Sequence, residues 1–141
     1  MQRHIFGVTT TMLGSLDPES DEAVANACVA VRGLVALVLG HTRFEETYIH
    51  PLFEAAAPDV AAFFDAQHIE FDHRFARLED RVAALESVEM VDRSTAAGDL
   101  YDEFVTILAS YYEHMELEEQ RAAPILQKNM TKRQSSTLNS H

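Results

Sequence analysis

Apolar side chains recur at alternating steps of three and four residues in three long stretches of the chain. This spacing puts them on one face of an α-helix, where they can be buried against other helices. The inward positions of the first stretch are Val24, Ala27, Val31, Leu34, Val38, His41, Glu45, Tyr48 and Leu52. Those of the second are Ala61, Phe64, His68, Phe71, Phe75, Leu78, Val82 and Leu85, and those of the third are Leu100, Phe104, Ile107, Tyr111, His114, Glu118 and Ile125. The pattern predicts three long helices that pack together in a bundle.

A shorter and weaker helix is expected at the start of the chain, over about residues 2–13. Gly7 and the threonines at 9–11 are poor helix formers, so intrinsic propensity contributes little to this helix. A loop over residues 14–22 follows, and either Asp17 or Ser20 is expected to cap the next helix.

Proline and serine mark the ends of the remaining helices. Pro51 should kink or end the first long helix, and the segment 57–59, which contains Pro58, is expected to turn the chain into the second. Ser94 is expected to cap the last helix. The sequence has no strand pattern, so we expect an all-α domain over residues 1–128 and a polar, disordered tail over 129–141.

The net charge of the chain argues against two classes of binding partner. The chain has 141 residues, of which 47% are hydrophobic, and its formal net charge is -12. This length suits a single domain with a sizeable core. Proteins that bind nucleic acid or anionic membranes usually do so through clusters of Lys and Arg. This acidic chain is therefore expected to bind neither of them.

The apolar run over residues 23–40 is long enough to raise the question of a membrane span. Arg32 stands at its centre, and His41 and Glu45 follow it, which favours a buried helix of a bundle. The residues before the run are acidic, unlike those of a secretory signal. The single cysteine, Cys28, cannot form an internal disulfide and has apolar neighbours, so we expect a reduced, buried thiol in a cytoplasmic protein.

One polar motif occurs twice with the same spacing. The pattern H-x-x-x-E-E-x-x-x-x-P begins at His41 and again at His114, and in both copies the histidine and the first glutamate fall on inward positions. An imidazole and a carboxylate at positions i and i+4 project from one face of a helix. Each pair can therefore bind one metal ion, or two neighbouring ions, if other helices supply more ligands.

The burial of these groups strengthens the metal hypothesis. An unpaired carboxylate in a protein core shifts its pKa or destabilises the fold, and a lone inward histidine is usually a hydrogen-bonded core side chain. Here five ionisable residues share the predicted core, which favours a metal site. They are His41, Glu45, His68, His114 and Glu118.

The heights of these residues along an antiparallel bundle agree with one another. The midpoint of Glu45 and His68 falls in the turn between their helices, and the midpoint of His68 and Glu118 falls in the next loop. Three helices can thus converge on one level. His4 fails the same test, because it lies roughly 15 Å from the level of His41 at a rise of 1.5 Å per residue, and it is kept only as a secondary ligand candidate.

Other polar and aromatic residues near the motif are expected to have structural roles. We expect no metal at His50, His73 or His141. We expect Glu46 and Glu119 to be solvated or to contact the ligands from outside, and Tyr48 and Tyr111 to be core aromatics.

At these residues the chain resembles the bacterial hemerythrin-like, or HHE cation-binding, domain. The segments His41-x-x-x-Glu45 and His114-x-x-x-Glu118 match its two H-x-x-x-E motifs, and His68 matches the ligand on the helix between them. The resemblance covers most of the chain. It implies an up-down-up-down four-helix bundle around a non-haem di-iron site, with terminal histidine ligands and with Glu45 and Glu118 as carboxylates that bridge two oxo-linked iron ions.

The chain departs from the respiratory hemerythrins at two places. Those proteins carry H-x-x-x-H on the third helix and an aspartate on the fourth, whereas this chain has Asp72 one turn after His68 and has Glu118 on its last helix. Relatives of this kind place a first-helix histidine slightly before the position of His4. Either His4 substitutes for that ligand or the site lacks it.

The expected function is a metal-binding protein whose iron centre binds or senses dioxygen, nitric oxide or peroxide, because histidine and carboxylate ligands suit iron. Two alternatives stay open. The first is a di-iron enzyme with ferroxidase, peroxidase-like or iron–sulfur repair activity, although a ferritin-like oxidase needs E-x-x-H on two helices and the copy Glu70-x-x-His73 lies off the inward face. The second is a metal-free helical interaction module, if the first-helix ligand is absent.

Overall fold

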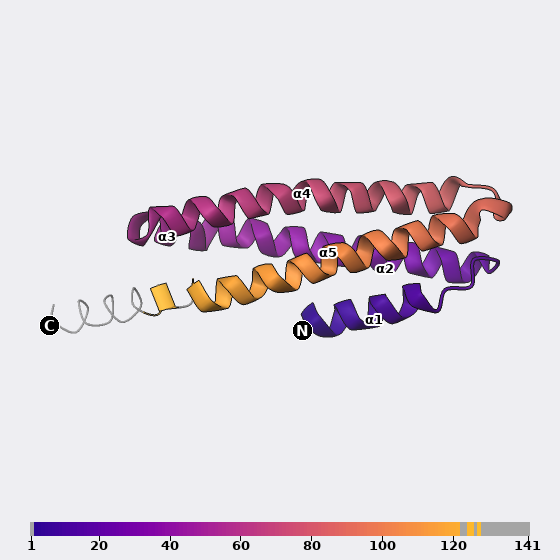
Figure 1. The fold of residues 1–141 in the computed structure, drawn as a ribbon, viewed down its shortest axis with the longest axis horizontal. Coiled ribbons are helices and arrows are strands. Elements are labelled where there is room, and N and C mark those ends of the chain that lie inside the picture. Colours follow the sequence, from indigo (N-terminus) through magenta and orange to yellow (C-terminus); the bar gives the residue numbers. More distant parts are fainter. Residues whose placement is uncertain (1, 122–123, 126, 128–141) are drawn as a thin grey trace, which may run out of the picture.

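The computed structural model describes residues 2–121, 124–125 and 127, and these residues form an all-α bundle without strands (Figure 1). The four main helices are α1 (Gln2–Gly14), α2 (Asp21–Phe44), α4 (Pro58–Ser87) and α5 (Arg93–Arg121). A π-helical turn (Glu45–Ile49) joins α2 to the short α3 (His50–Ala56), and a 3-10 turn (Met90–Asp92) precedes α5. Consecutive main helices run in opposite directions, so the predicted fold class is confirmed. The predicted tail over 129–141 lies outside the described residues.

Two of the predicted helix starts are confirmed. Ser20 caps α2, and its hydroxyl oxygen accepts a hydrogen bond of 3.1 Å from the backbone N–H of Ala23. Pro58 opens α4 in its first turn, directly after Ala57, which has a non-helical backbone. Proline fits this position because a backbone N–H in the first turn has no partner within the helix.

The predicted cap of the last helix is wrong. The 3-10 turn runs directly into α5 at Arg93, so Ser94 lies inside the first turn of the helix and not at its boundary. Arg93 has a different role, because its guanidinium donates a hydrogen bond of 2.6 Å to Asp21 Oδ1. This contact joins the first residue of α2 to the first residue of α5 at one end of the bundle.

The π turn changes the inward face of the helix that follows it. The N–H of His50 donates to the carbonyl oxygen of Glu45, five residues back, so the turn holds one residue more than an α-helical turn. The inward face therefore moves on by one residue, and Ile49 and Phe53 take the inward positions. Tyr48, which we expected in the core, is instead 65% exposed. The helix type changes just before Pro51 and the helix ends at Ala56, as the proline suggested.

The first helix is short, and its hydroxyl groups bond to its own backbone. Thr9, Thr10, Thr11 and Ser15 each donate to the carbonyl oxygen four residues earlier, at 2.7 to 3.0 Å. With 13 residues, α1 is roughly 20 Å long, whereas the 36 residues of Asp21–Ala56 span roughly 54 Å. α1 therefore covers only the part of the bundle nearest the first loop (Figure 1).

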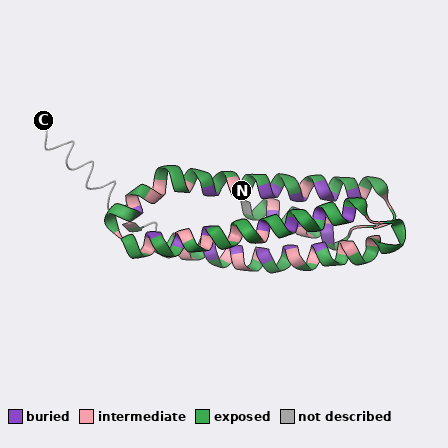
Figure 2. Cartoon of the chain, turned by 90° about the horizontal axis from the view of Figure 1, so that it is seen from above, coloured by how far each residue is buried: buried purple, intermediate pink, exposed green. Residues whose placement is uncertain are grey.

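The buried side chains form two apolar clusters, and the purple positions in Figure 2 follow the inward faces of the helices. The larger cluster joins α1, α2, α4 and α5 and includes Cys28, whose thiol is buried as expected. The smaller one, near the α3–α4 turn, contains Phe53, Ala61 and Phe64. Burial raises the pKa of the Cys28 thiol, which keeps it in the neutral, unreactive form.

The helical run Asp21–Ala56 is long and apolar enough to cross a membrane, by length and composition alone. In this structure its inner face is buried in the large cluster, through residues such as Val31 and Leu34. Arg32, at the centre of the run, pairs with Glu86 of α4 on the outside of the bundle. Packing within the bundle, as predicted, therefore explains why the inner face of this run is apolar.

Truncation of a leucine should lower the free energy of unfolding more on the inner face of α2 than on its outer face. Leu34 is 3% exposed and Leu37 is 40% exposed on the same helix. Leu34→Ala should lower the free energy of unfolding by about 2–5 kcal/mol, because it leaves a cavity, whereas Leu37→Ala should change it by less than about 1 kcal/mol. Urea unfolding of the two variants measures the difference, and equal losses would contradict the packing described here.

Candidate metal centre

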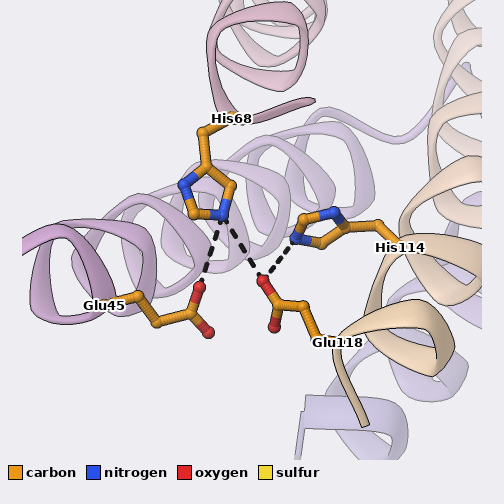
Figure 3. Close-up of side chains that lie close together, drawn as sticks. All are labelled: Glu45, His68, His114 and Glu118. Carbon is orange, nitrogen blue, oxygen red and sulfur yellow. Dashed lines mark hydrogen bonds and ion pairs between the residues drawn. The ribbon is translucent and has the colours of Figure 1, made fainter. Parts of the chain in front are cut away.

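Four ionisable side chains from three helical segments meet inside the bundle (Figure 3). Glu45 is the first residue of the π turn, His68 comes from α4, and His114 and Glu118 lie one turn apart on α5. One nitrogen or oxygen atom of each residue lies within 4.8 Å of those of the other three. These residues were predicted as ligands, and the structure brings them together.

The ion pairs within this group all involve the Nε2 atoms of the two histidines. His68 Nε2 lies 3.3 Å from Glu45 Oε2 and 3.4 Å from Glu118 Oε1, and His114 Nε2 lies 2.7 Å from the same oxygen of Glu118. Both imidazole rings are buried, and the two carboxylates are mostly shielded from solvent. The lone-pair atoms of the group therefore face a common point inside the bundle.

His41 stands at the edge of this group. Its Nε2 atom lies 2.6 Å from Glu45 Oε1, so the two oxygens of Glu45 contact two different histidines, His41 and His68. The side chain of His41 is 45% exposed, and its ring lies outside the four-residue group. It is exposed because α1 is too short to cover this part of α2.

His4 is an exposed residue of α1, and the structure does not bring it into the four-residue group. The neighbouring contacts place the first turns of α1 along α5. Phe6 packs edge-on against Tyr111 and Tyr112, and the Arg3 guanidinium lies 3.8 Å from Glu119. The site thus lies at the level where α1 begins, so the offset of roughly 15 Å expected for His4 is wrong. His4 stays outside the group because its side chain is exposed to solvent, and the side of the site facing α1 has little cover.

Aromatic rings form the rest of the wall around the histidines. Phe64 and Phe71 meet the ring of His114 edge-on, with centroids 5.8 and 5.2 Å away. Tyr111, expected as a core aromatic, is buried and stacks on the same ring at 5.8 Å. These contacts hold the imidazole in one orientation and keep water away from it.

The prediction from sequence missed one residue of the site, Gln67. His114 Nδ1 donates a hydrogen bond of 2.5 Å to Gln67 Oε1, which places the proton of the neutral ring on Nδ1 and leaves the lone pair on Nε2. Histidines that bind metals usually have such an acceptor on their second nitrogen. Gln67 carries no sequence signal of this role beyond its position next to His68.

The other polar residues near the motif lie outside the four-residue group. Glu46 Oε1 is 3.6 Å from His68 Nδ1, so this glutamate contacts the group from outside, and Glu119 is exposed. His50 Nδ1 lies 3.2 Å from Asp65 Oδ1, at a different place on the bundle, and His73 is exposed. His141 lies outside the described residues.

The electrostatics of the metal-free protein follow from these contacts. Burial is the largest single influence on His68 and lowers its pKa, but hydrogen bonds and charges from Glu118 and Glu45 outweigh it and raise the pKa to about 10. Burial likewise raises the pKa of Glu118, and its contacts with His114, His68 and Glu45 outweigh that effect and hold the pKa well below its usual range. Without metal, a protonated His68 therefore neutralises part of the carboxylate charge.

The donor set fits a metal ion of intermediate hardness. It offers two imidazole nitrogens and two carboxylates, and such nitrogen and oxygen donors suit iron, manganese and zinc. A cation at this point would also replace the positive charge that the protonated His68 supplies, because a coordinating imidazole must be neutral. The four residues are therefore able to hold a cation.

Comparison with known families agrees with this geometry. The model of the hemerythrin HHE cation binding domain matches residues 11–126, and the chain belongs to that family. The matched range contains all four residues of the group and His41, and it begins after His4. The chain matched no curated protein and no solved structure.

The stability of the metal-free protein should depend on pH in both directions. The pKa of His68 is about 10 in the folded state against an ordinary 6.5, so its stabilising effect is complete below pH 6.5 and is lost as the pH rises towards 10. The pKa of Glu118 is lowered from 4.5, so its effect is present above pH 4.5 and is lost as the pH falls further.

The free energy of unfolding should therefore be greatest between pH 4.5 and 6.5. His68→Gln should remove most of the fall on the alkaline side. Urea unfolding of both proteins, with a chelator present and at a series of pH values, measures this. Parallel pH profiles for the wild type and the variant would show that His68 is not protonated in the folded, metal-free protein.

Gln67→Leu should weaken metal binding about 10–100-fold, because the variant no longer holds the proton of His114 on Nδ1. Gln67→Glu keeps an acceptor at this place and should bind nearly as tightly as the wild type. Competition with a chromophoric chelator measures the affinity. Gln120→Leu, at an exposed glutamine of α5, is the matched control, and equal affinities for Gln67→Leu and Gln120→Leu would exclude a role for Gln67.

Proposed function

We propose that this chain is a non-haem iron protein that binds a small ligand, namely dioxygen, nitric oxide or peroxide, at two iron ions. The proposed ligands are His41, Glu45, His68, His114 and Glu118. The observation that carries the proposal is the buried group of two imidazoles and two carboxylates in a chain of the HHE cation-binding family.

The proposed roles of the residues follow from the direction of their atoms. Glu45 turns one oxygen to His41 and the other to His68, which supports a carboxylate that bridges two ions. His68 and His114 turn Nε2 to the common point, which supports terminal ligation through that atom. Iron held by these residues would supply a redox-active centre for a small ligand.

The surroundings of the group support a small ligand over a larger substrate. Phe64, Phe71 and Tyr111 pack against the His114 ring and leave it no space for a bulky molecule. The side facing α1 has less cover, and we propose that the ligand arrives there. The buried, unpaired Cys28 supports a location in the cytoplasm, which is part of the proposal.

An enzyme with ferroxidase or peroxidase-like activity at the same centre is the second candidate. The contact of the Tyr111 ring with the His114 ring favours it, because a tyrosine next to a metal ligand is well placed to lose an electron. The two candidates share their ligands, so they differ only in what happens to the small molecule. A bound ligand is released unchanged, whereas a substrate is consumed.

The test is to load the chain with ferrous iron without oxygen, measure its iron content, and record visible spectra with and without dioxygen, nitric oxide or hydrogen peroxide. We expect up to about two iron ions per chain and a new absorption band with at least one ligand. A band that disappears on degassing supports binding, and catalytic loss of peroxide supports the enzyme. A chain that retains no iron above background contradicts the proposal.

His114→Ala should remove most of the bound iron, because it deletes one proposed ligand and leaves Glu118 without its partner. Metal that binds only the folded state raises the melting temperature, so the variant should melt close to the metal-free wild type. His50→Ala is the control, since His50 pairs with Asp65 away from the group. Similar iron losses in both variants would contradict the ligand assignment.

A further inference from the structure

A groove of about 240 Å³ runs along the outside of the bundle between α2 and α4. Apolar side chains, among them Leu39 and Phe75, form part of it. Its charged residues are three carboxylates, Glu46, Asp72 and Glu79, against a single guanidinium, that of Arg43. The groove is thus an acidic depression with partly apolar walls, and such a shape concentrates the field of its charges.

One end of the groove adjoins the proposed metal centre. Glu46 directly follows Glu45 in the π turn, and Asp72 lies one helical turn after His68 on α4. Glu79 lies about two further turns along α4 from Asp72. The carboxylates therefore line a path that leads along α4 towards the level of the centre.

A buried atom links the groove to the centre. The side chain of His68 is only 8% exposed, and its Nδ1 atom has no hydrogen-bond partner. This nitrogen faces Glu46 Oε1 at 3.6 Å, while Nε2 of the same ring faces Glu45 and Glu118. Glu46 is half-exposed, so its side chain spans the distance between solvent in the groove and the buried ring.

We propose that this groove is the path by which a divalent metal cation reaches the centre, with Asp72 and Glu79 attracting the hydrated cation and Glu46 leading it past the His68 ring to the centre. The inference rests on the proposed function, since it supposes that the centre binds a metal. A carboxylate path suits a hydrated divalent cation, because it offers oxygen atoms that can replace water molecules one at a time.

The experiment compares two double variants of α4 that change the net charge equally. Asp72→Asn with Glu79→Gln removes both attracting carboxylates of the groove, and Glu70→Gln with Asp80→Asn removes two exposed carboxylates that do not line it. All four side chains are exposed, so both proteins should fold. The probe is Co²⁺, whose visible absorption reports binding without a redox step, and stopped-flow mixing with the metal-free full chain measures the rate of uptake.

The groove variant should take up Co²⁺ about 3–10-fold more slowly than the control at low ionic strength, and the difference should shrink as salt is added. Both variants should reach the same final Co²⁺ content as the wild type. Arg43→Gln should change the rate in the opposite direction and speed uptake.

Equal rates for the two double variants would overturn the inference. So would a lower final content in the groove variant at an unchanged rate, because Asp72 and Glu79 would then be ligands. A wild type that binds neither Co²⁺ nor iron at equilibrium would instead contradict the proposed function.

Discussion

The contact of His68 with Glu45 and Glu118 allows this bundle to keep carboxylates in its interior. Removing an isolated carboxylate from water costs several kcal/mol, and truncating one partner of a buried pair typically costs about 3–5 kcal/mol. Here the compensating charge is on α4 and the carboxylates are on the π turn and α5, so one imidazole joins three helical segments. The groups that would hold a cation also hold the helices together when no cation is bound.

The surroundings of the four-residue group differ in polarity and charge on its three sides. Aromatic rings close the side around His114, the acidic groove adjoins the side of His68, and the side towards α1 has less cover because that helix begins at this level. Neutral molecules and cations respond differently to such walls. An apolar or open wall admits a neutral diatomic molecule, whereas a line of carboxylates favours a cation. The arrangement would permit a cation and a neutral ligand to approach from different directions.

The sequence predicted the fold class and four of the residues that meet, because both depend on helical periodicity. Periodicity places His68, His114 and Glu118 on inward faces, and these residues lie at or near the core. It failed at Tyr48, because a π turn shifts the inward face and has no simple signature in the spacing. It also missed Gln67, whose role depends on the distance between two helices. A contact of this kind cannot be derived from the period of a single helix.

The π turn also makes the two copies of the repeated motif differ in structure. The two copies of H-x-x-x-E-E-x-x-x-x-P have the same spacing, yet the first passes through the π turn while the second copy, as far as Arg121, is regular α-helix. The copies also differ in burial, since His114 is buried and His41 is half-exposed, so they are equivalent in sequence but not in structure. A π turn is equivalent to one residue inserted into an α-helix. Deletion of one residue within Glu45–Ile49 would turn this segment into regular α-helix and leave Phe53 facing Phe64, because Phe53 would then follow Glu45 at α-helical spacing. This single extra residue thus joins two helical phases, one that places Glu45 at the centre and another that closes the end of the bundle.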